Sequence, residues 1–460
     1  MAEFDVIVLG GGPGGYIAAE RLARAGRSVL LAEKTAVGGT CLNVGCIPTK
    51  ALMGCAKLYD EARGSARFGV NAADVSYDWS VMQDWKARAV ASLVGGVTGM
   101  LKRAGVVVQT GEAGWRGGNR VVLGGEVHRG RDIIIATGSS PVWPDIAGVA
   151  GNPLVVDSTG LLEVAAVPAR LAVVGGGVIG IEFASIFARL GTAVTVIEAL
   201  DEVLGVMDRS LAARLRTSAP GVDFHLGTVV EAIDGGRVTC SKGGATFGVE
   251  ADLVLMAVGR RPNVTGWLAE GTGLDFDARG VRVDDRMATN VDHVWAVGDV
   301  TGRGALAHAA YRMGEVAAAN ILARATGGAA QVFRAETVPW AVYGYPEAAG
   351  VGLTEEACRS RGLAVASVTL PLGVSGRFVA EHGASRAGLV KLVAETASGV
   401  VRGVQLVGPY APEIIWGAAH LLETGSTIAD IRSLVFPHPS ISEAIREAAW
   451  AFPTEERNPR

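Results

Sequence analysis

Two stretches of the chain show the same order of apolar runs, glycines and helical periodicity. Residues 4–34 read "FDVIVLGGGPGGYIAAERLARAGRSVLLAEK", and residues 170–198 read "RLAVVGGGVIGIEFASIFARLGTAVTVIE". Short apolar runs bounded by glycine are typical of buried strands, whereas apolar positions three and four residues apart are typical of helices. Each stretch therefore predicts a strand, a glycine turn, a helix and a second strand.

Both turns have the spacing G-x-G-x-x-G, and an acid ends each second strand. The residues are Gly10, Gly12 and Gly15 with Glu33, and Gly175, Gly177 and Gly180 with Glu198. Such glycines permit a tight turn and close approach of the backbone to a pyrophosphate, and the acid can accept hydrogen bonds from a ribose. One such motif is a weak signal, because glycine turns are common. Two complete units predict two dinucleotide sites; the alternative is that one unit is only a structural turn.

The residues that follow the second unit bear on the choice of nucleotide. A 2′-phosphate needs Arg or Lys just beyond the second strand. This chain has "EALDE" there, with Glu198, Asp201 and Glu202. Because these carboxylates would repel a 2′-phosphate, the sequence favours NAD over NADP.

Shorter apolar runs that end in glycine follow these units. They are "IIIATGSSPVWP" (133–144), "LVLMAVGRRPN" (253–263) and "VDHVWAVGDV" (291–300). Asp299, near the end of the last run, can reach a hydroxyl of a bound sugar, and a turn cap is the alternative. From about residue 336 strand-like aromatic residues, a hairpin pattern and two helical patterns follow without a third fingerprint. The sequence predicts an α/β protein with two Rossmann-like units and a separate C-terminal α+β domain.

Composition and charge exclude several kinds of partner. The chain has 460 residues and a formal net charge of -4, so charge gives no indication of nucleic acid or of an anionic membrane. No apolar run approaches the roughly 18 residues that span a bilayer. The N-terminus has no basic leader and enters an apolar run at once, so we expect a cytoplasmic protein. Five cysteines in this length do not indicate a disulfide scaffold.

Two of the cysteines lie close together, in "GGTCLNVGCIPTK" at 38–50. In a reducing compartment a close pair is more often catalytic or metal-binding than structural. In a regular helix Cys41 and Cys46 would have Cα atoms roughly 8.7 Å apart, whereas a disulfide needs about 4.4–6.8 Å. The pair can therefore bridge only if a helix starts or is distorted between them, which Gly45 permits.

The residues after the pair favour a reactive thiolate. Pro48 suits the first turn of a helix, which would place Cys46 near a helix N-terminus, where the dipole lowers the pKa of a thiol. A redox-active disulfide beside the first nucleotide unit is the favoured interpretation, and two buried thiols that never pair are the alternative. A metal site is not expected, because no histidine lies at finger-like spacing and the other cysteines are isolated: Cys55, Cys240 and Cys358.

Thiol–disulfide exchange also needs a base, and the chain has seven histidines. His438 lies in "FPHPSISEAIREA", between prolines and just before a helical pattern, and Glu443 follows five residues later. A carboxylate that contacts an imidazole raises its basicity and fixes its tautomer, so this pair is a candidate base. His308 could cap a helix. The remaining five are expected to be structural or solvent-facing, with His128 in polar or turn-like surroundings and His382 in a polar loop.

The stretch around the two cysteines resembles the active-site signature of the flavin-dependent pyridine nucleotide–disulfide oxidoreductases of class I. The resemblance runs over nearly the whole chain, since both fingerprints, "ATGSSP", "AVGRRPN", "AVGDV", "LAHAA", "VPWAVYGYPE" and "HPSISE" come in the family's order. Within this family the chain most resembles the dihydrolipoamide dehydrogenases. The resemblance implies an FAD-binding domain at 1–145, an NAD-binding domain at 146–265, a central segment at 266–335 that completes the FAD site, and a C-terminal dimerisation domain at 336–460.

The resemblance also implies roles for single residues. Cys41 would exchange with the dithiol substrate, and Cys46 would face the flavin as the charge-transfer thiolate. Lys50 would lie near flavin N5, with Glu182 as its ion-pair partner.

His438 and Glu443 would form the base, which in this family reaches the disulfide of the other subunit of a homodimer. Asp299 would contact the ribityl and pyrophosphate region of FAD. Further FAD contacts are implied at Gly10, Gly12, Gly15, Glu33, Lys50, Thr137, Gly138 and Ala307, and NAD contacts at Gly175, Gly177, Gly180, Glu198 and Gly259.

The activity that the resemblance implies is oxidation of protein-bound dihydrolipoamide with NAD⁺. His438 would remove a thiol proton, the thiolate would attack Cys41, Cys46 would reduce FAD, and the flavin would pass hydride to NAD⁺. The dithiol arm would come from a lipoyl carrier of a 2-oxo acid dehydrogenase, glycine-cleavage or related system. A sister NAD(P)H-dependent reductase of another disulfide and a non-catalytic flavoprotein subunit are the alternatives.

Some features separate the chain from other members of the family. Glutathione and trypanothione reductases usually use NADPH, against "EALDE", and mercuric reductases would need a C-terminal cysteine pair, which "AWAFPTEERNPR" lacks. Three positions depart from the usual acidic pattern after "LAHAA", and they are occupied by Tyr311, Arg312 and Met313. Ser440 replaces a commoner Thr, and 371–383 is also unusual. These departures flank the site and bear on the lipoyl carrier more than on the reaction.

Overall fold

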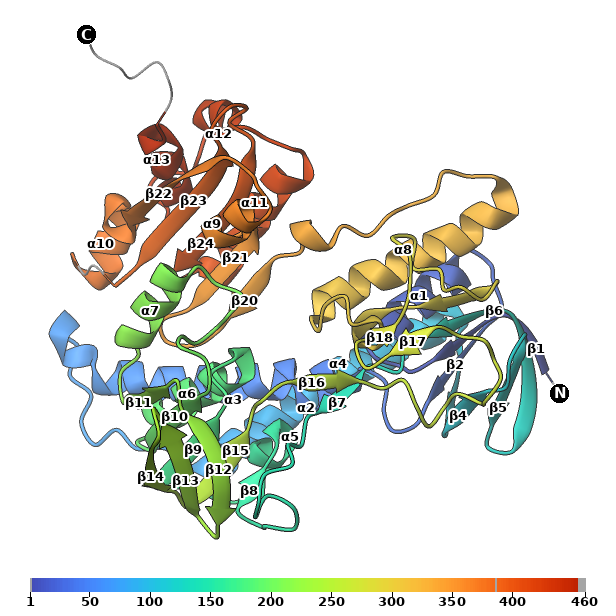
Figure 1. The fold of residues 1–460 in the computed structure, drawn as a ribbon, viewed down its shortest axis with the longest axis horizontal. Helices are drawn as coiled ribbons and strands as arrows, with labels where there is room; N and C mark the ends of the chain where they lie inside the picture. Colours follow the sequence, from blue (N-terminus) through green and yellow to red (C-terminus); the bar gives the residue numbers. More distant parts are fainter. Residues whose placement is uncertain (1, 385–386, 454–460) are drawn as a thin grey trace.

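The computed structural model describes residues 2–384 and 387–453, and its elements form three groups (Figure 1). Residues 454–460 lie outside the described residues. They are part of the C-terminal tail in which a mercuric reductase would need a cysteine pair. The first group holds the first fingerprint, the second group holds the second, and the C-terminal group holds neither. This arrangement matches the predicted fold class.

A seven-stranded sheet carries the first fingerprint, in the order β3-β2-β1-β6-β5-β4 with β19 beside β6. β1 pairs in parallel with β2 and β6, and β19 pairs in parallel with β6, so a strand from a distant segment completes this sheet. Apolar runs such as "DVIVL" and "RDIIIA" are explained by burial of both sheet faces. The strands are β1 (Ala2–Leu9), β2 (Val29–Glu33), β3 (Val107–Thr110), β4 (Ala113–Trp115), β5 (Arg120–Leu123), β6 (Glu126–Ile135) and β19 (Val294–Ala296).

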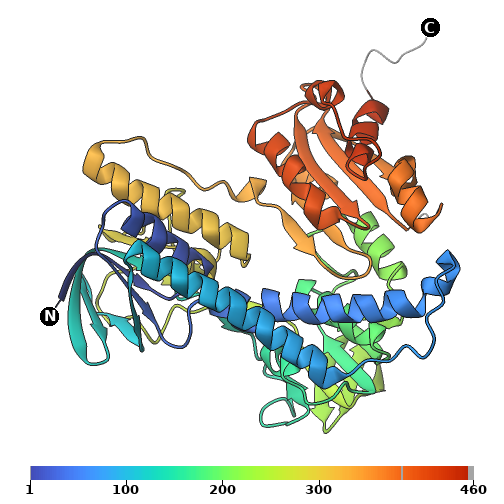
Figure 2. The ribbon, with the colours of Figure 1, turned by 180° about the vertical axis from the view of Figure 1, so that it is seen from behind.

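Helices α1 (Pro13–Arg24) and α8 (Ala307–Thr326) lie side by side over this sheet (Figure 2). Their contact is close because both carry glycine: a Cβ added to Gly314 would lie 2.4 Å from the carbonyl oxygen of Gly14. Two long helices, α3 (Cys46–Arg63) and α4 (Trp79–Ala104), pack against one another, and α3 also packs on α6 (Val178–Arg189) of the second group. The cysteine segment is therefore held between the two fingerprint units.

The second group has a parallel five-stranded sheet in the order β11-β10-β9-β15-β8 and a small antiparallel sheet, β12-β13-β14. The chain crosses between the first two groups twice at one place, where β7 and β16 pair antiparallel. The strands are β7 (Ser139–Pro141), β8 (Val155–Val156), β9 (Arg170–Val174), β10 (Ala193–Glu198), β11 (Val222–Leu226), β12 (Val229–Asp234), β13 (Arg237–Lys242), β14 (Ala245–Glu250), β15 (Leu253–Met256) and β16 (Arg260–Pro262). The helices are α5 (Ser158–Leu162), α6 and α7 (Arg209–Thr217).

The C-terminal group is an antiparallel sheet in the order β20-β21-β24-β23-β22 with helices packed on it. The predicted hairpin is confirmed, since β23 pairs antiparallel with β24. The strands are β20 (Trp340–Val342), β21 (Ala348–Gly352), β22 (Val365–Pro371), β23 (Leu389–Glu395) and β24 (Val401–Val407). The helices are α9 (Glu355–Ser360), α10 (Gly376–His382), α11 (Ala411–Glu423), α12 (Ile428–Ser433) and α13 (Glu443–Ala451).

Two strand–turn–helix units whose strands pair in parallel, and a C-terminal α+β domain, confirm the predicted fold class. The domain boundaries proposed from sequence, after residues 145, 265 and 335, stay predictions. Within the described residues, no helix has the length and apolar character needed to cross a membrane.

Candidate active site

The two cysteines lie on different helices that meet at a glycine. Cys41 is in α2 (Gly39–Val44), and Cys46 is the first residue of α3. Gly45 between them has φ -139° and ψ -110°, which interrupts the helical path. The predicted start of a new helix between the cysteines is therefore confirmed, and Pro48 lies in the first turn of α3.

The two thiols differ in pKa, because the hydrogen bond between them shifts the two pKa values in opposite directions. The hydrogen bond from Cys41 holds the pKa of Cys46 low, at about 7, against the effect of burial, and Lys50 lowers it further. The same hydrogen bond, followed by burial, raises the pKa of the Cys41 thiol above its ordinary value. The thiolate of the reduced pair is therefore centred on Cys46.

A partly buried ion pair stands one helical turn from Cys46. Lys50 Nζ lies 2.9 Å from Glu182 Oε1 and 2.7 Å from Oε2, and Glu182 on α6 is 5% exposed. The backbone N–H of Tyr343 donates to Glu182 Oε1 at 3.0 Å, and Lys50 Nζ stands 4.5 Å from the centre of the Tyr343 ring. Three segments far apart in sequence thus fix one ammonium group beside the thiolate.

The first fingerprint has the close contacts that its glycines predict. A Cβ on Gly15 would lie 1.9 Å from the carbonyl oxygen of Gly10, and a Cβ on Gly10 would lie 2.3 Å from that of Ala136. Gly12 precedes α1 without a side-chain cap, so its helix N-terminus keeps N–H groups available for an anion. Glu33 accepts the Gly11 N–H at 2.7 Å on Oε2 and two hydrogen bonds from Thr35 on Oε1, which leaves one lone pair of Oε2 for a ribose hydroxyl. These residues fit a dinucleotide such as FAD.

The second fingerprint repeats this geometry with more open space. A Cβ on Gly180 would lie 2.0 Å from the Gly175 carbonyl oxygen, whereas a Cβ on Gly177 would meet no protein atom within 4 Å. Packing therefore does not require glycine at 177, but approach of a pyrophosphate would. Glu198 accepts the N–H groups of Gly176 at 2.6 Å and Leu200 at 2.8 Å. These residues fit NAD.

The structure refines the charge argument for NAD. Asp201 pairs with Arg209 at 2.7 Å, and Glu202 pairs with Arg216 at 2.8 Å. Arginines therefore neutralise two of the three carboxylates in "EALDE", and repulsion of a 2′-phosphate depends mainly on Glu198.

A polar cluster joins the crossing between the first two groups to Asp299. The Ser139 hydroxyl donates to Asp299 Oδ2 at 2.6 Å and accepts from Arg260 Nε at 2.8 Å, and Arg260 also donates to the Ser139 carbonyl oxygen at 2.6 Å. Burial lowers the pKa of the Arg260 guanidinium, which also feels the charges of Asp299 and Cys46. Asp299 therefore follows strand β19, and the Ser139 hydroxyl holds its carboxylate in place.

The other predicted contacts lie at element ends around this cluster. The Thr137 hydroxyl donates to the Asn263 carbonyl oxygen at 3.0 Å, and Gly138 has φ +70°. Gly259 has φ +117° and open space around it. Ala307 is the first residue of α8, whose N-terminus has no side-chain cap, so its N–H groups are available to a ligand.

The candidate base forms as predicted but lies far from the cysteines of its own chain. His438 Nδ1 lies 2.9 Å from Glu443 Oε1, and Glu443 Oε2 accepts the Ser440 N–H at 2.9 Å. The Ser440 N–H and then His438 hold the pKa of Glu443 below its ordinary value. The His438 side chain is 77% exposed. Figure 1 shows α13 and α2 in separate parts of the molecule. One chain therefore brings together Cys41, Cys46, Lys50 and Glu182, but not the base.

Two expectations about the surroundings of other histidines are wrong. His128 is not in polar surroundings, since it lies in β6, is 5% exposed and has neither ring nitrogen hydrogen-bonded. Side chains along β6 alternate between the two faces of the sheet, and His128 lies on the face that is buried at this position. His382 is the last residue of helix α10 rather than part of a loop. That helix begins where the Ser375 side chain caps its N-terminus. His308 Nε2 lies 2.5 Å from the Pro339 carbonyl oxygen near the start of α8.

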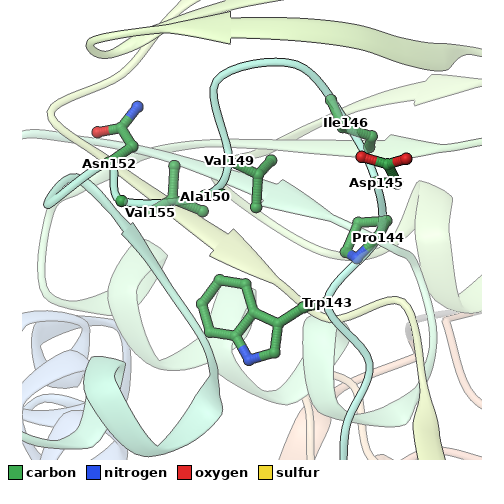
Figure 3. Close-up of a pocket in the computed structure, with 9 residues that line it drawn as sticks. Trp143, Pro144, Asp145, Ile146, Val149, Ala150, Asn152 and Val155 are labelled. Atoms are coloured by element: carbon green, nitrogen blue, oxygen red, sulfur yellow. The ribbon is translucent and has the colours of Figure 1, made fainter.

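A cavity of about 480 Å³ lies beneath the loop 143–155, away from these groups (Figure 3). Trp143, Ile146 and Val149 line it, with Asn152 at its edge, and none of its lining residues belongs to the predicted site. Asn152 already donates to the carbonyl oxygens of Gly148 and Gly235. Asp145 adds a carboxylate to this lining, and the cavity is separate from the candidate site.

The family model for pyridine nucleotide-disulphide oxidoreductases matches residues 4–314, and the model for the dimerisation domain of these enzymes matches residues 338–449. The chain belongs to this family. The oxidoreductase therefore has a flavin site and a pyridine nucleotide site, and FAD and NAD are its cofactors.

Individual relatives agree over almost the full length. A dihydrolipoyl dehydrogenase of Thermus scotoductus is 40% identical over 98% of this chain and 98% of its own, and one of Haloferax volcanii is 41% identical over 97% and 95%. Among solved structures, LpdA of Mycobacterium tuberculosis has a TM-score of 0.86 at 27% identity, covering 98% of this chain and 99% of its own. RclA of Escherichia coli, a flavoprotein disulfide reductase induced by HOCl, has 0.85 at 29%, covering 98% and 100%.

Four residues near this site were given no role in it from the sequence. Tyr343 braces the ion pair, Arg260 braces Asp299 through Ser139, and the Tyr16 hydroxyl lies 2.5 Å from that of Tyr311. The signals were partly present, since Arg260 lies within "AVGRRPN" and Tyr311 departs from the usual pattern. Nothing in the spacing alone indicated their partners.

Proposed function

We propose that the enzyme oxidises protein-bound dihydrolipoamide to lipoamide with NAD⁺, through a redox disulfide between Cys41 and Cys46. The observation that carries this proposal is the polarised thiol pair, with the pKa of Cys46 at about 7 and that of Cys41 raised. A dithiol reductant needs one sulfur that it can attack and another that leaves as a stable thiolate. The similarity to dihydrolipoyl dehydrogenases over almost the full length supports lipoamide as the substrate.

The sulfur chemistry proceeds in two exchanges. A substrate thiolate attacks Cys41, a bond forms between the two sulfurs, and the electron pair of the disulfide passes to Cys46 as thiolate. The second substrate thiol loses its proton and attacks the first substrate sulfur, which closes the lipoamide ring and returns an electron pair to Cys41. Cys46 leaves readily in the first step, because its thiolate is stabilised by Cys41 and Lys50.

The residues of the first group would hold FAD, and those of the second would hold NAD. Bound FAD supplies a two-electron acceptor that links the thiolate to NAD⁺. Gly10, Gly12 and Gly15 would meet its pyrophosphate, Glu33 a ribose, and Asp299 the ribityl region. Lys50, fixed by Glu182, provides a positive charge near the reacting sulfur. In this proposal, residues 1–145 and 266–335 hold FAD and residues 146–265 hold NAD.

The base would come from a second copy of the chain. His438 is oriented by Glu443 yet is 77% exposed, and among the described residues its own chain offers it no reacting partner. Apolar side chains are exposed around it, with Val435 at 97% and Leu434 at 45%, and a dimer would bury such residues. Residues 336–460 would form this interface, in agreement with the dimerisation model that matches 338–449. His438 of the partner subunit would then take the proton from the substrate thiol that attacks Cys41.

The partner that brings the dithiol would be a lipoyl-carrying protein. We propose a carrier of a 2-oxo acid dehydrogenase, glycine-cleavage or related system. Reduction of another disulfide is the second candidate, and the fold of RclA at 29% identity favours considering it. The two candidates differ in the direction of electron flow and in the thiol that is accepted.

The test is NADH formation from NAD⁺ with dihydrolipoamide, run beside NADP⁺ and beside reduced glutathione. We expect turnover only with the combination of NAD⁺ and dihydrolipoamide. The Cys46→Ser variant should lose this turnover and keep its bound FAD. Turnover of that variant near the parent rate would exclude the disulfide mechanism. A parent enzyme whose flavin is reduced by NADH but not by dihydrolipoamide would favour the second candidate.

A further inference from the structure

Two tyrosines from separate helices share a hydrogen bond beside the cysteine pair. Tyr16 lies on α1 and is 4% exposed, whereas Tyr311 lies on α8 and is half-buried. Their hydroxyl oxygens are 2.5 Å apart, and their rings meet edge to face with centres 5.8 Å apart. The pair depends on the close approach of the two helices at Gly14 and Gly314.

The backbone fixes this pair near Cys41. The Gly38 N–H donates to the Gly11 carbonyl oxygen at 2.8 Å, and a Cβ on Gly39 would lie 2.6 Å from Gly12 Cα. Helix α2, which carries Cys41, therefore starts against the glycine turn that precedes α1. Tyr16 lies one helical turn after Gly12 of that turn. The charge of the two cysteines reaches both hydroxyls. It raises the pKa of Tyr16 after burial, the hydrogen bond and the charge of Tyr311, and it also raises the pKa of Tyr311 after burial, whereas the hydrogen bond from Tyr16 lowers that pKa.

Counting protons shows that this pair has an unused donor. Each hydroxyl has one proton, and only one proton can lie between the two oxygens. Tyr16 is buried, so leaving its proton unpaired would cost more than leaving that of Tyr311 unpaired. Tyr16 therefore donates to Tyr311. Among the described residues, the Tyr311 hydroxyl has no other hydrogen-bond partner.

Cys41 is the group in the proposed reaction that needs a donor. Its thiolate is costly, because burial and the contact with Cys46 both favour the protonated form. In the second exchange, however, Cys41 must leave as a thiolate, and exchange is slow when the leaving thiol is a weak acid.

We propose that the Tyr311 hydroxyl, held by the Tyr16 hydroxyl, donates a hydrogen bond to the Cys41 sulfur as that sulfur leaves the mixed disulfide with the substrate. In this step the second substrate thiolate forms a bond to the first substrate sulfur. The bond between that sulfur and Cys41 breaks, and its electron pair goes to Cys41. No proton needs to leave Tyr311. Donation from Tyr16 polarises the Tyr311 O–H and makes it a better donor, so Tyr311 is a catalytic residue and Tyr16 a positioning residue. This inference rests on the proposed exchange at Cys41.

Stopped-flow reduction of the oxidised holoenzyme separates this role from a structural one. The bound flavin is reduced either by saturating dihydrolipoamide, which requires exchange at Cys41, or by NADH, which does not. Tyr311→Phe keeps the ring and removes the donor. We expect it to slow reduction by dihydrolipoamide about tenfold or more, the effect of a hydrogen bond to a charged group, and to change reduction by NADH less than about twofold.

Tyr16→Phe and a double variant test the linkage between the hydroxyls. Tyr16→Phe should slow reduction by dihydrolipoamide by a smaller factor, and it should have no further effect in the Tyr311→Phe background. Tyr77→Phe is the matched control, because that hydroxyl donates to the Leu190 carbonyl oxygen elsewhere. It should leave both rates unchanged.

Each other outcome overturns the inference. Parent-like reduction of Tyr311→Phe by dihydrolipoamide would show that its hydroxyl is not a donor to Cys41. Equal slowing with dihydrolipoamide and with NADH would assign the pair to packing alone. If the parent enzyme itself is not reduced by dihydrolipoamide, the proposed function fails, and this inference fails with it; that result is distinguishable because it appears before any substitution.

Discussion

The ion pair between Lys50 and Glu182 should act on Cys46 in opposite directions through its two members. Lys50 lowers the pKa of Cys46, and the negative charge of Glu182 raises it. Lys50→Met should therefore reduce the thiolate fraction, whereas Glu182→Gln should increase it. The glutamine keeps an amide oxygen that can accept the Tyr343 N–H, so the contact with the Tyr343 backbone is preserved.

The size of the first effect follows from the helix. Cys46 and Lys50 are four residues apart on α3, so their charged atoms are on the order of 6 Å apart. At an effective permittivity of about 20, unit charges at this distance attract by about 3 kcal/mol, which equals about two pKa units. Because the Lys50 side chain is 32% exposed, solvent reduces this to between about one and two units. The pKa of Cys46 should move from about 7 to about 8–9.

A pH titration of the two-electron-reduced enzyme measures this shift. The thiolate next to the flavin gives long-wavelength absorbance, and its amplitude follows the thiolate fraction. At pH 7 that fraction should fall from about one half in the parent to about one tenth or less in Lys50→Met. For Glu182→Gln the midpoint should lie below that of the parent. Shifts of both variants in the same direction would refute the electrostatic reasoning, since a general loss of structure would move both alike.

The remaining predictions concern the base, a domain contact and the second nucleotide site. His438→Gln should lower kcat with dihydrolipoamide by about 10²- to 10⁴-fold and leave NADH-dependent ferricyanide reduction unchanged; a loss in both assays would contradict a role in thiol deprotonation. Lys391 Nζ lies 2.5 Å from Asp208 Oδ2 and 2.8 Å from Glu355 Oε2, so Lys391→Met should cost about 3–5 kcal/mol and lower the thermal midpoint. Although burial opposes it, the hydrogen bond from Lys391 holds the pKa of Asp208 down, so this stability is present above the unfolded pKa of about 3.9 and is lost as pH falls through the folded value; the variant's midpoint should depend less on acid, and an unchanged midpoint at pH 7 would refute the ion-pair argument. Gly177→Ala should weaken NAD⁺ binding about tenfold or more without lowering FAD content or the thermal midpoint, because the added methyl meets no protein atom within 4 Å, and unchanged NAD⁺ affinity in isothermal titration would contradict it.

Local patterns of the sequence predict the fingerprints and the cysteine helices well, because the physics there is local. The interruption at Gly45 follows from the distance that a disulfide needs, and the structure has a new helix starting at Cys46. The His438 and Glu443 contact also follows from residues five apart at the start of a helix. In each case the atoms that meet are separated by less than two helical turns.

Other parts could not be predicted, because their atoms are brought together by packing between distant segments. Glu182 is 132 residues from Lys50, and Tyr343 is 161 residues from Glu182. The charge argument for NAD changed for the same reason, since Arg209 and Arg216 neutralise acids that look unpaired in "EALDE". His128 was misplaced because polar neighbours in the sequence say little about which face of a strand is buried.

The positions of the site residues explain why one chain prepares its base before it meets its target. Glu443 is held by the Ser440 N–H and orients His438, while the imidazole remains 77% exposed. If a partner subunit docks against this surface as proposed, it would receive an imidazole whose orientation is already fixed, and association would cost little additional side-chain entropy at that group. The cysteine pair is prepared in the same way, since Lys50 and Glu182 are in contact within one chain. Dimerisation would then join two preorganised halves, which is the condition under which a shared site can be as precise as one built within a single chain.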